Sequence, residues 1–390
     1  MAGIESSPVR DLLHLTSEPD MISFAGGLPA PECFDVEGWR AAFQAALTGP
    51  HARRHLQYSP TEGNLELRAR LAERLSARGL PTDVPDLLIT TGSQQALTLV
   101  ATGLLDPGAV VLVEAPTYLA ALQTFQLAGA RIIPVCADDD GMDPQSLRAV
   151  LAGVTPAAIY LTPTFGNPTG RTLSSARRTE IAQLAQAHGF WIIEDDPYSE
   201  LRYDGELVPA IATLPEATDR CLYLGTLSKT GAPGLRLGWL RAPGPVGRTL
   251  AVVKQASDLH TSTIDQAAAA AYLAAADLDA HVRTLCQTYR QRRDSMLSTI
   301  ASTLPDGSTW NQPRGGMFIW ARLPHGADSQ QHLDAALRHK VAFVPGWPFF
   351  ASEPDRSTLR LSFTTHTPDE IAEGMRRLEV ALRAGRRRRP

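Results

Sequence analysis

Residues 226–238 place a lysine and an arginine seven positions apart in a segment rich in small residues. Lys229 follows an apolar run, and a lysine in a constricted apolar site can have a lowered pKa and act as a Schiff-base nucleophile. Arg236 has the geometry to bind a phosphate dianion through two parallel hydrogen bonds. A surface lysine in a Ser/Gly loop is the alternative interpretation of this segment alone.

Residues 89–97 predict a strand end, a tight turn at Gly92 and a helix that begins near Ser93. The unpaired N–H groups and positive dipole of such a helix start suit a phosphate, although ordinary capping by Ser93 is the alternative. Residues 194–196 are three adjacent carboxylates at the end of an apolar run. Such carboxylates repel one another unless a cation compensates, so one of them can pair with a protonated ring nitrogen. The alternative is a cap for the following helix.

Two further segments hold single polar residues at defined positions. Asn167 lies in a loop bounded by proline and glycine, where a plain turn is the alternative. Arg360 alternates with apolar residues on a short predicted strand, where it would be a rigid clamp for a carboxylate or an ion-paired arginine at a sheet edge.

One ligand satisfies most of these groups together. It needs an aldehyde for Lys229, a phosphate for the Gly92 turn and Arg236, and a basic ring nitrogen for a carboxylate among residues 194–196. Pyridoxal 5'-phosphate (PLP), which acts as an electron sink for carbanions, has all three features. The segments therefore predict a PLP site.

The elements that must position these residues alternate between helices and strands. Leu67, Leu71 and Leu75 recur at a spacing of four and predict a helix over residues 62–79. Apolar runs, separated by helical patterns, follow at residues 87–90, 110–113, 132–135, 158–161, 191–193 and 222–224. This order predicts an α/β fold with a mostly parallel sheet buried on both faces, and such sheets bind ligands at the carboxyl ends of their strands.

The pattern changes after about residue 245. It predicts helices over residues 265–277, 282–304 and 371–382 and short strands at residues 317–323, 341–344 and 359–363. We therefore expect a smaller α+β domain. The predicted division is an N-terminal segment of residues 1–44, a large domain of residues 45–265 and a small domain of residues 266–390.

Composition narrows the classes of function. The chain has 390 residues, a formal charge of −4 and 44% hydrophobic residues, which is an ordinary globular composition. This balance removes the electrostatic case for nucleic acid, and no apolar run approaches the roughly 18 residues of a membrane span. The start of the chain does not read as a secretory signal. Its four cysteines form no CxxC pair, so we expect no metal site and a cytoplasmic protein with reduced thiols.

Many ordered motifs resemble those of the fold-type I PLP-dependent aminotransferases of class I/II. The resemblance is nearest to the subgroup of 2-aminoadipate, kynurenine and branched-chain aminotransferases. The motifs are SPVRDLLHLT, SFAGGLPAPECF, LQYSPTEGNLELR, TTGSQQAL, VEAPTYLAAL, FGNPTG, EDDPYSEL, LSKTGAPGLRLGW, SDLHTS, RGGMFIW, VPGWPFF and LRLSFT. The resemblance implies transfer of an amino group from an amino acid to a 2-oxo acid, expected to be 2-oxoglutarate, by a ping-pong cycle.

The resemblance also implies roles for individual residues. Lys229 would hold the cofactor covalently and shuttle a proton, and Asp195 would pair with the pyridine nitrogen. Asn167 and Tyr198 would hold the 3-hydroxyl oxygen, and Tyr118 would stack on the ring. The residues implied for the phosphate are Ser93, Gln94, Ser228 and Arg236, with Thr226 as a further candidate.

Further implied roles concern the substrate and a neighbouring subunit. Tyr58 would reach the phosphate in a neighbouring subunit, so a homodimer is expected. Arg360, with Asn167 and the backbone around Gly27, would bind the substrate α-carboxylate. Arg10 would lie on a segment over the site and meet a distal carboxylate, with an ordinary surface arginine as the alternative.

Two residues depart from the subgroup's pattern, and other reactions stay open. Trp347 stands where a small residue is usual and could narrow the pocket, and Gly166 stands where a longer polar residue is usual. A β-lyase, decarboxylase or oxidase would use the same lysine and phosphate site but give different products. A PLP-binding sensor domain without its DNA-binding module is a further alternative.

Overall fold

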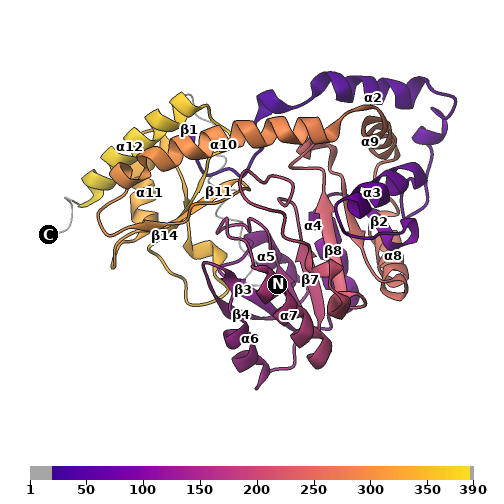
Figure 1. The fold of residues 1–390 in the computed structure, drawn as a ribbon, viewed down its shortest axis with the longest axis horizontal. Coiled ribbons are helices and arrows are strands. Elements are labelled where there is room, and N and C mark those ends of the chain that lie inside the picture. Colours follow the sequence, from indigo (N-terminus) through magenta and orange to yellow (C-terminus); the bar gives the residue numbers. More distant parts are fainter. Residues whose placement is uncertain (1–19, 387–390) are drawn as a thin grey trace.

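An eight-stranded sheet forms the centre of the larger part of the computed structural model, which describes residues 20–386 (Figure 1). In spatial order its strands are β2 (Leu87–Thr90), β9 (Gly238–Arg241), β8 (Cys221–Thr226), β7 (Trp191–Asp195), β6 (Ala158–Leu161), β3 (Val110–Ala115), β4 (Arg131–Asp138) and β5 (Gly141–Met142). Neighbouring strands from β8 to β4 pair in parallel, whereas β9 and β5 pair antiparallel with their neighbours. The prediction of a mostly parallel sheet is confirmed.

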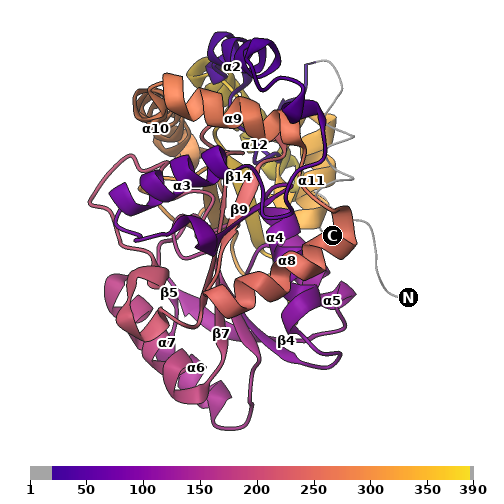
Figure 2. The same cartoon turned by 90° about the vertical axis from the view of Figure 1, so that its right-hand side faces the viewer.

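Helices cover both faces of this sheet (Figure 2). One face packs against α4 (Ser93–Leu104), α5 (Leu119–Leu127) and α8 (Gly244–Asp258). The other packs against α3 (Leu65–Ala77), α6 (Pro144–Leu151) and α7 (Ser175–His188), with α2 (Val36–Thr48) and α9 (Thr263–Ala275) in the same core. Successive side chains of a strand alternate between the two cores, so both cores need apolar residues. This burial on both faces explains the continuous apolar runs in the sequence.

A smaller antiparallel sheet forms the second part of the molecule. Its strands, in spatial order, are β10 (Thr309–Trp310), β11 (Phe318–Arg322), β14 (Thr358–Ser362) and β13 (Val344–Pro345). The helices around it are α10 (Leu278–Thr303), α11 (Ser329–Arg338) and α12 (Pro368–Arg386). The parallel pair of β1 (Ile22–Ser23) and β12 (Val341–Ala342) brings the start of the described chain against this part.

The predicted domain boundary at residue 265 stays a prediction, but the buried cores indicate where packing changes. Buried alanines of α9 belong to the core of the large sheet. Helix α10 contributes Leu278 and Val282 to that core, and Leu285 and Tyr289 to the core of the small sheet. The two cores therefore divide within α10, which crosses from one part to the other in Figure 1.

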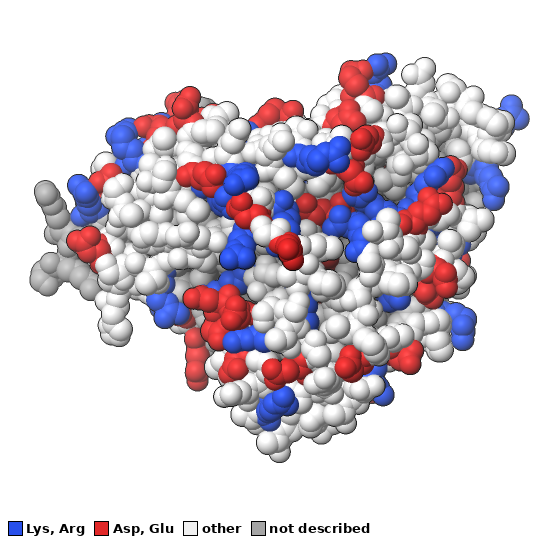
Figure 3. Space-filling view, viewed as in Figure 1, with Lys and Arg blue, Asp and Glu red and all other residues white. Residues whose placement is uncertain are grey.

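Acidic and basic side chains are intermingled on the face shown in Figure 3. Among residues 20–386, no helix is both long enough and apolar enough to cross a membrane. All four cysteines are free thiols, and Cys221 is buried.

Candidate active site

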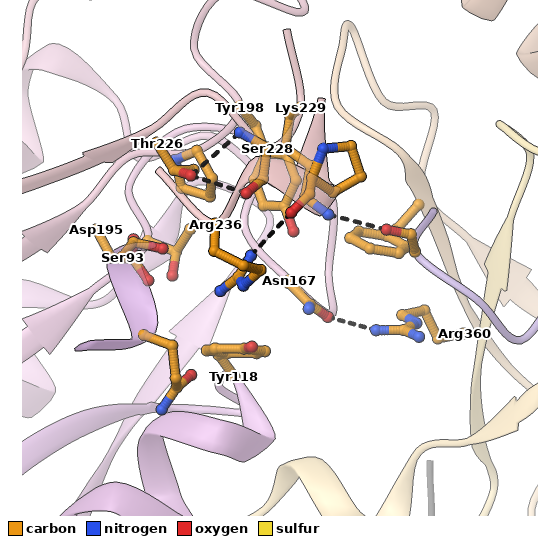
Figure 4. A pocket seen from close by; sticks show the side chains of 16 residues that line it. Ser93, Tyr118, Asn167, Asp195, Tyr198, Thr226, Ser228, Lys229, Arg236 and Arg360 are labelled. Carbon is orange, nitrogen blue, oxygen red and sulfur yellow. Dashed lines mark hydrogen bonds between the residues drawn. The ribbon is translucent and has the colours of Figure 1, made fainter. Parts of the chain in front are cut away.

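A cavity of about 290 Å³ lies where β6, β7 and β8 end, between the large sheet and the small one. Twelve residues singled out in the sequence line it, so one site brings together segments from residue 27 to residue 360 (Figure 4). They are Gly27, Ser93, Gln94, Tyr118, Asn167, Asp195, Tyr198, Thr226, Ser228, Lys229, Arg236 and Arg360.

The first turn of α4 and Arg236 form one end of the cavity. Gly92 caps α4 with φ of 78°, and Ser93 and Gln94 occupy the first helical positions. Arg236 has a left-handed backbone (φ 52°), and its guanidinium lies over the turn, since a Cβ on Gly92 would meet Arg236 Nη2 at 2.4 Å. A cationic side chain beside the free N–H groups of a helix N-terminus can bind an anion through both its charge and hydrogen bonds.

Thr226 and Ser228 extend this polar end. The Thr226 hydroxyl accepts a hydrogen bond from the Ser228 backbone N–H at 3.1 Å and donates to Leu237 O at 2.9 Å. The Ser228 and Thr226 hydroxyl oxygens are 2.9 Å apart. These bonds fix the loop that leads from β8 to Lys229.

Asp195 supplies a carboxylate to the cavity from the end of β7. Its Oδ2 accepts a hydrogen bond from the Tyr160 hydroxyl at 2.7 Å, whereas buried Oδ1 has no partner among the described residues. Burial raises the pKa of Asp195 to about 6, against the hydrogen bond from Tyr160. A buried carboxylate oxygen without a partner is costly, so it fits a ligand that donates a proton, such as a protonated ring nitrogen.

The two neighbouring carboxylates, Glu194 and Asp196, form hydrogen bonds outside the cavity. Glu194 accepts hydrogen bonds from the backbone N–H groups of Ile211 at 2.9 Å and Ala212 at 2.8 Å, outside the cavity. Asp196 accepts the Tyr223 hydroxyl at 2.8 Å. Of the three adjacent acids only Asp195 lines the cavity, and Glu194 points to the other face because successive strand side chains alternate.

Tyr160 is a residue that the sequence analysis missed. Its hydroxyl is buried and lies between Asp195 and Thr162, whose hydroxyl donates to it at 3.3 Å. The sequence signal was available, because a tyrosine inside a fully buried strand needs a partner for its hydroxyl. Thr162, Pro197, Pro233 and Phe318 also line the cavity and were not predicted.

We expect Tyr160→Phe to lower turnover about tenfold with little change in KM, since a hydrogen bond to a charged group contributes about 1.5–3 kcal/mol. Without that bond the pKa of Asp195 rises further, so less of the carboxyl is ionised to pair with a protonated ring nitrogen, and its orientation is less fixed. Tyr223→Phe is the matched control, since it removes the same type of bond from Asp196 outside the cavity. Steady-state kinetics on both variants test the assignment, and equal losses would contradict it.

Lys229 lines the same cavity as Asp195. Its Nζ donates to Gly27 O at 3.0 Å. Burial lowers the pKa of Lys229 to about 8, helped by Arg360 and Arg236 and opposed by Asp195. About a tenth of this amine is therefore neutral and nucleophilic at pH 7, far more than for a lysine with the ordinary pKa of 10.5.

Arg360 stands on β14 at the opposite side of the cavity from Ser93 in the view of Figure 4. Its Nη1 donates to Asn167 Oδ1 and its Nη2 to Ala25 O, both at 2.7 Å. The guanidinium carbon lies 4.3 Å from the ring centre of Phe318 and 5.1 Å from that of Phe349. No carboxylate pairs with it among its described partners, and burial lowers its pKa to about 10. A buried guanidinium of this kind fits an anionic ligand group.

Two tyrosines complete the walls between these charged groups. Tyr118 caps the start of α5, and burial raises its pKa to about 12, so it stays neutral. Burial also raises the pKa of Tyr198, against a hydrogen bond from Asn167. Both hydroxyls are therefore neutral hydrogen-bonding groups at physiological pH.

Tyr58, Trp347 and Gly166, also named in the sequence analysis, are not among the residues that line the cavity. Tyr58 is exposed on the surface, and Arg10 lies outside the described residues. The Trp347 indole donates to Gln330 at 3.3 Å and so does not narrow the cavity. At Gly166 a Cβ would lie 2.7 Å from Thr162 O, so this backbone has no room for a longer residue.

The arrangement fits PLP on the chemistry of its groups. An anion site, an amine of lowered pKa and an unpartnered carboxylate oxygen face one cavity, and these suit a phosphate, an aldehyde and a protonated pyridine. The amine and the carboxylate alone would serve many enzymes, but the anion site beside them adds a place for the phosphate of a phosphorylated aldehyde.

Comparisons with known proteins agree with this geometry. An aromatic-amino-acid aminotransferase of Thermococcus litoralis is 42% identical over 98% of this chain and 92% of its own length. The structure of Pyrococcus horikoshii kynurenine aminotransferase, in complex with PMP, has a TM-score of 0.93 and 39% identity, covering 98% of this chain and 95% of that one.

A second structure is that of the α-aminoadipate aminotransferase LysN of Thermus thermophilus, complexed with N-(5'-phosphopyridoxyl)-L-leucine. It has a TM-score of 0.92 and 38% identity, covering 98% of this chain and 96% of that one. The family described as aminotransferase class I and II matches residues 29–378. The chain therefore belongs to the class I and II aminotransferases of fold-type I and is a PLP-dependent transaminase.

Proposed function

We propose that the cavity holds PLP with its phosphate at the start of α4, its aldehyde at Lys229 and its ring nitrogen at Asp195. The observation that carries this placement is the unpartnered Asp195 Oδ1 in the same buried cavity as the Lys229 amine. When bound, PLP supplies an electron sink for the carbanion formed at the amino acid's Cα. The neutral Lys229 amine takes the proton from that Cα.

The other residues bind and orient. Tyr118 packs on the ring face, Asn167 and Tyr198 hold the 3-hydroxyl oxygen, and Arg236 with Ser93, Gln94, Thr226 and Ser228 holds the phosphate. Arg360 binds the α-carboxylate, helped by Asn167 and the backbone at Gly27. Amino acids and 2-oxo acids share this carboxylate, so one site serves both halves of a ping-pong cycle. We propose 2-oxoglutarate as the acceptor.

The visible absorption spectrum tests this function directly. Amino acids such as glutamate, 2-aminoadipate, leucine or an aromatic amino acid should bleach the band of the lysine-bound cofactor, and a 2-oxo acid should restore it. Ammonia, sulfide or peroxide as products would instead favour a lyase or an oxidase. The rank of donors gives the substrate preference.

The rate at which cofactor-free protein captures PLP should rise with pH and level off above about 8. The neutral amine is the nucleophile, and a pKa of about 8 makes it the main form above that value. With an ordinary lysine the rate would keep rising until the pH approached the usual lysine pKa of 10.5. Stopped-flow absorbance between pH 6 and pH 10 distinguishes the two, and continued climbing above pH 9 would refute the shifted pKa.

We further propose a cytoplasmic homodimer in which Tyr58 reaches the neighbouring phosphate. Tyr58 is 76% exposed, and the large apolar side chains of Leu56 and Leu65 nearby in sequence are also exposed, so a second subunit would have apolar surface to cover here. The Tyr58 ring meets His260 edge-on at 5.7 Å, so it is held at the surface rather than packed inward. The four free thiols suit the reducing cytoplasm.

Mixing two inactive variants tests the shared site. Tyr58→Ala lacks one phosphate contact and Lys229→Ala lacks the catalytic amine, but a mixed dimer contains one complete site. We expect activity at limiting PLP to return on mixing, up to one active site in each mixed dimer. No recovery after subunit exchange, confirmed by mass measurement of the mixed dimer, would place Tyr58 outside the neighbouring site.

A further inference from the structure

Side chains that do not line the cavity hold the Thr91–Gly92 turn in place through hydrogen bonds. Gln95, one turn into α4, accepts the Thr91 backbone N–H on Oε1 at 2.7 Å. Its Nε2 donates to Asp258 Oδ2 at 2.6 Å. Gln95 therefore connects the turn before α4 to the last residue of α8, while the neighbouring Gln94 lines the cavity.

Lys254 occupies the centre of this connection. Its side chain is 0% exposed, and its Nζ donates to Gln95 Oε1 at 2.9 Å and to both Asp258 oxygens at 2.8 and 2.9 Å. All three ammonium protons are thus used. A buried ammonium costs more free energy than a methionine of similar shape, so its presence needs a reason other than packing.

That reason lies in the geometry of the turn. The backbone of Thr91 and Gly92 places the first N–H groups of α4 below the Arg236 guanidinium, which is within 2.4 Å of where a Gly92 Cβ would be. A phosphate there needs these donors in fixed positions, because each loosened donor weakens a charge-assisted hydrogen bond. Within residues 20–386, Gln95 Oε1 is the acceptor for the Thr91 N–H, and Lys254 and Asp258 fix both ends of the Gln95 amide.

We propose that Gln95 and Asp258, joined through the buried Lys254 ammonium, form a clamp that positions the Thr91–Gly92 turn and thereby sets the affinity of the site for the phosphate of the cofactor. The clamp residues are positioning residues, since none of them lines the cavity. This inference rests on the proposed function in one respect, which is that the phosphate of the cofactor binds at this turn.

Comparing PLP with pyridoxal, which lacks the phosphate, tests the clamp. Cofactor-free wild type, Lys254→Met and Gln95→Leu are titrated with each compound by absorbance. We expect each variant to bind PLP about tenfold more weakly, as for one charge-assisted hydrogen bond, and to bind pyridoxal as the wild type does. Turnover at saturating PLP should stay near that of the wild type, because Lys229 and Asp195 are untouched.

Thr249→Met is the matched control, because it places a methionine at an exposed position of the same helix. It should leave both affinities unchanged. Equal losses for PLP and pyridoxal, or no loss for either, would overturn the clamp, and thermal unfolding identifies a variant that has not folded. If the wild type itself binds pyridoxal as tightly as PLP, the phosphate assignment fails instead, so the two failures are distinguishable.

Discussion

Lys229→Ala should lower turnover about 10⁴-fold, the upper range for loss of a positioned proton-transfer group. In the function proposed above, the Lys229 amine is the cavity's nucleophile and its base, and no other lysine lines the cavity. The variant should still bind PLP without a covalent link, because Arg236 and the start of α4 remain. Single-turnover kinetics with a good amino donor measure the effect.

The small number of lysines gives a direct control for this prediction. The chain holds only three, Lys229, Lys254 and Lys340. Borohydride reduction of the loaded wild type should attach the cofactor to Lys229 alone, as read by peptide mass. Attachment to Lys254 or Lys340, or turnover above one hundredth of wild type in Lys229→Ala, would refute the assignment.

Asp195→Asn should lower turnover about 10²–10³-fold, as expected for removing a preorganised charge from a site that excludes water. The amide cannot keep a ring nitrogen protonated, and the Tyr160 hydroxyl then loses its charged acceptor. PLP binding should weaken much less, since the phosphate site is intact. Turnover and cofactor affinity measured on the same preparation separate the two effects.

Asp196→Asn is the matched control for this change. Asp196 is the next residue and also accepts a tyrosine hydroxyl, but it does not line the cavity. We expect its turnover to stay within a few-fold of wild type. A loss in Asp196→Asn equal to that in Asp195→Asn would mean that the effect comes from the fold of the segment and not from the cofactor's nitrogen.

The strands of the large sheet were predictable because burial on both faces leaves continuous apolar runs in the sequence. The predicted runs at residues 87–90 and 158–161 match β2 and β6 residue for residue. Strand β9 was missed, since its four residues follow a glycine-rich loop and contain one glycine and one arginine. Residues 341–344 were predicted as one strand, but β12 and β13 pair with different partners. Pairing of that kind depends on distant segments.

The sequence by itself determined the chemistry of this protein. The types and order of Lys229, Arg236, Asn167 and Arg360 point to a phosphorylated aldehyde and a carboxylate, because few ligands need all of these groups. The motifs around them were sufficient to indicate the family.

The tertiary structure decided which of these groups act together. Asp195 faces the cavity, whereas Glu194 on the same strand accepts backbone N–H groups and Asp196, just beyond β7, accepts the Tyr223 hydroxyl. The hydrogen bond from Tyr160 to Asp195 joins two residues that are 35 positions apart in the chain. The bond from Lys254 to Gln95 joins two that are 159 positions apart. Such contacts leave no local pattern, because a buried hydrogen bond constrains the distance between two side chains and not the residues beside them in sequence.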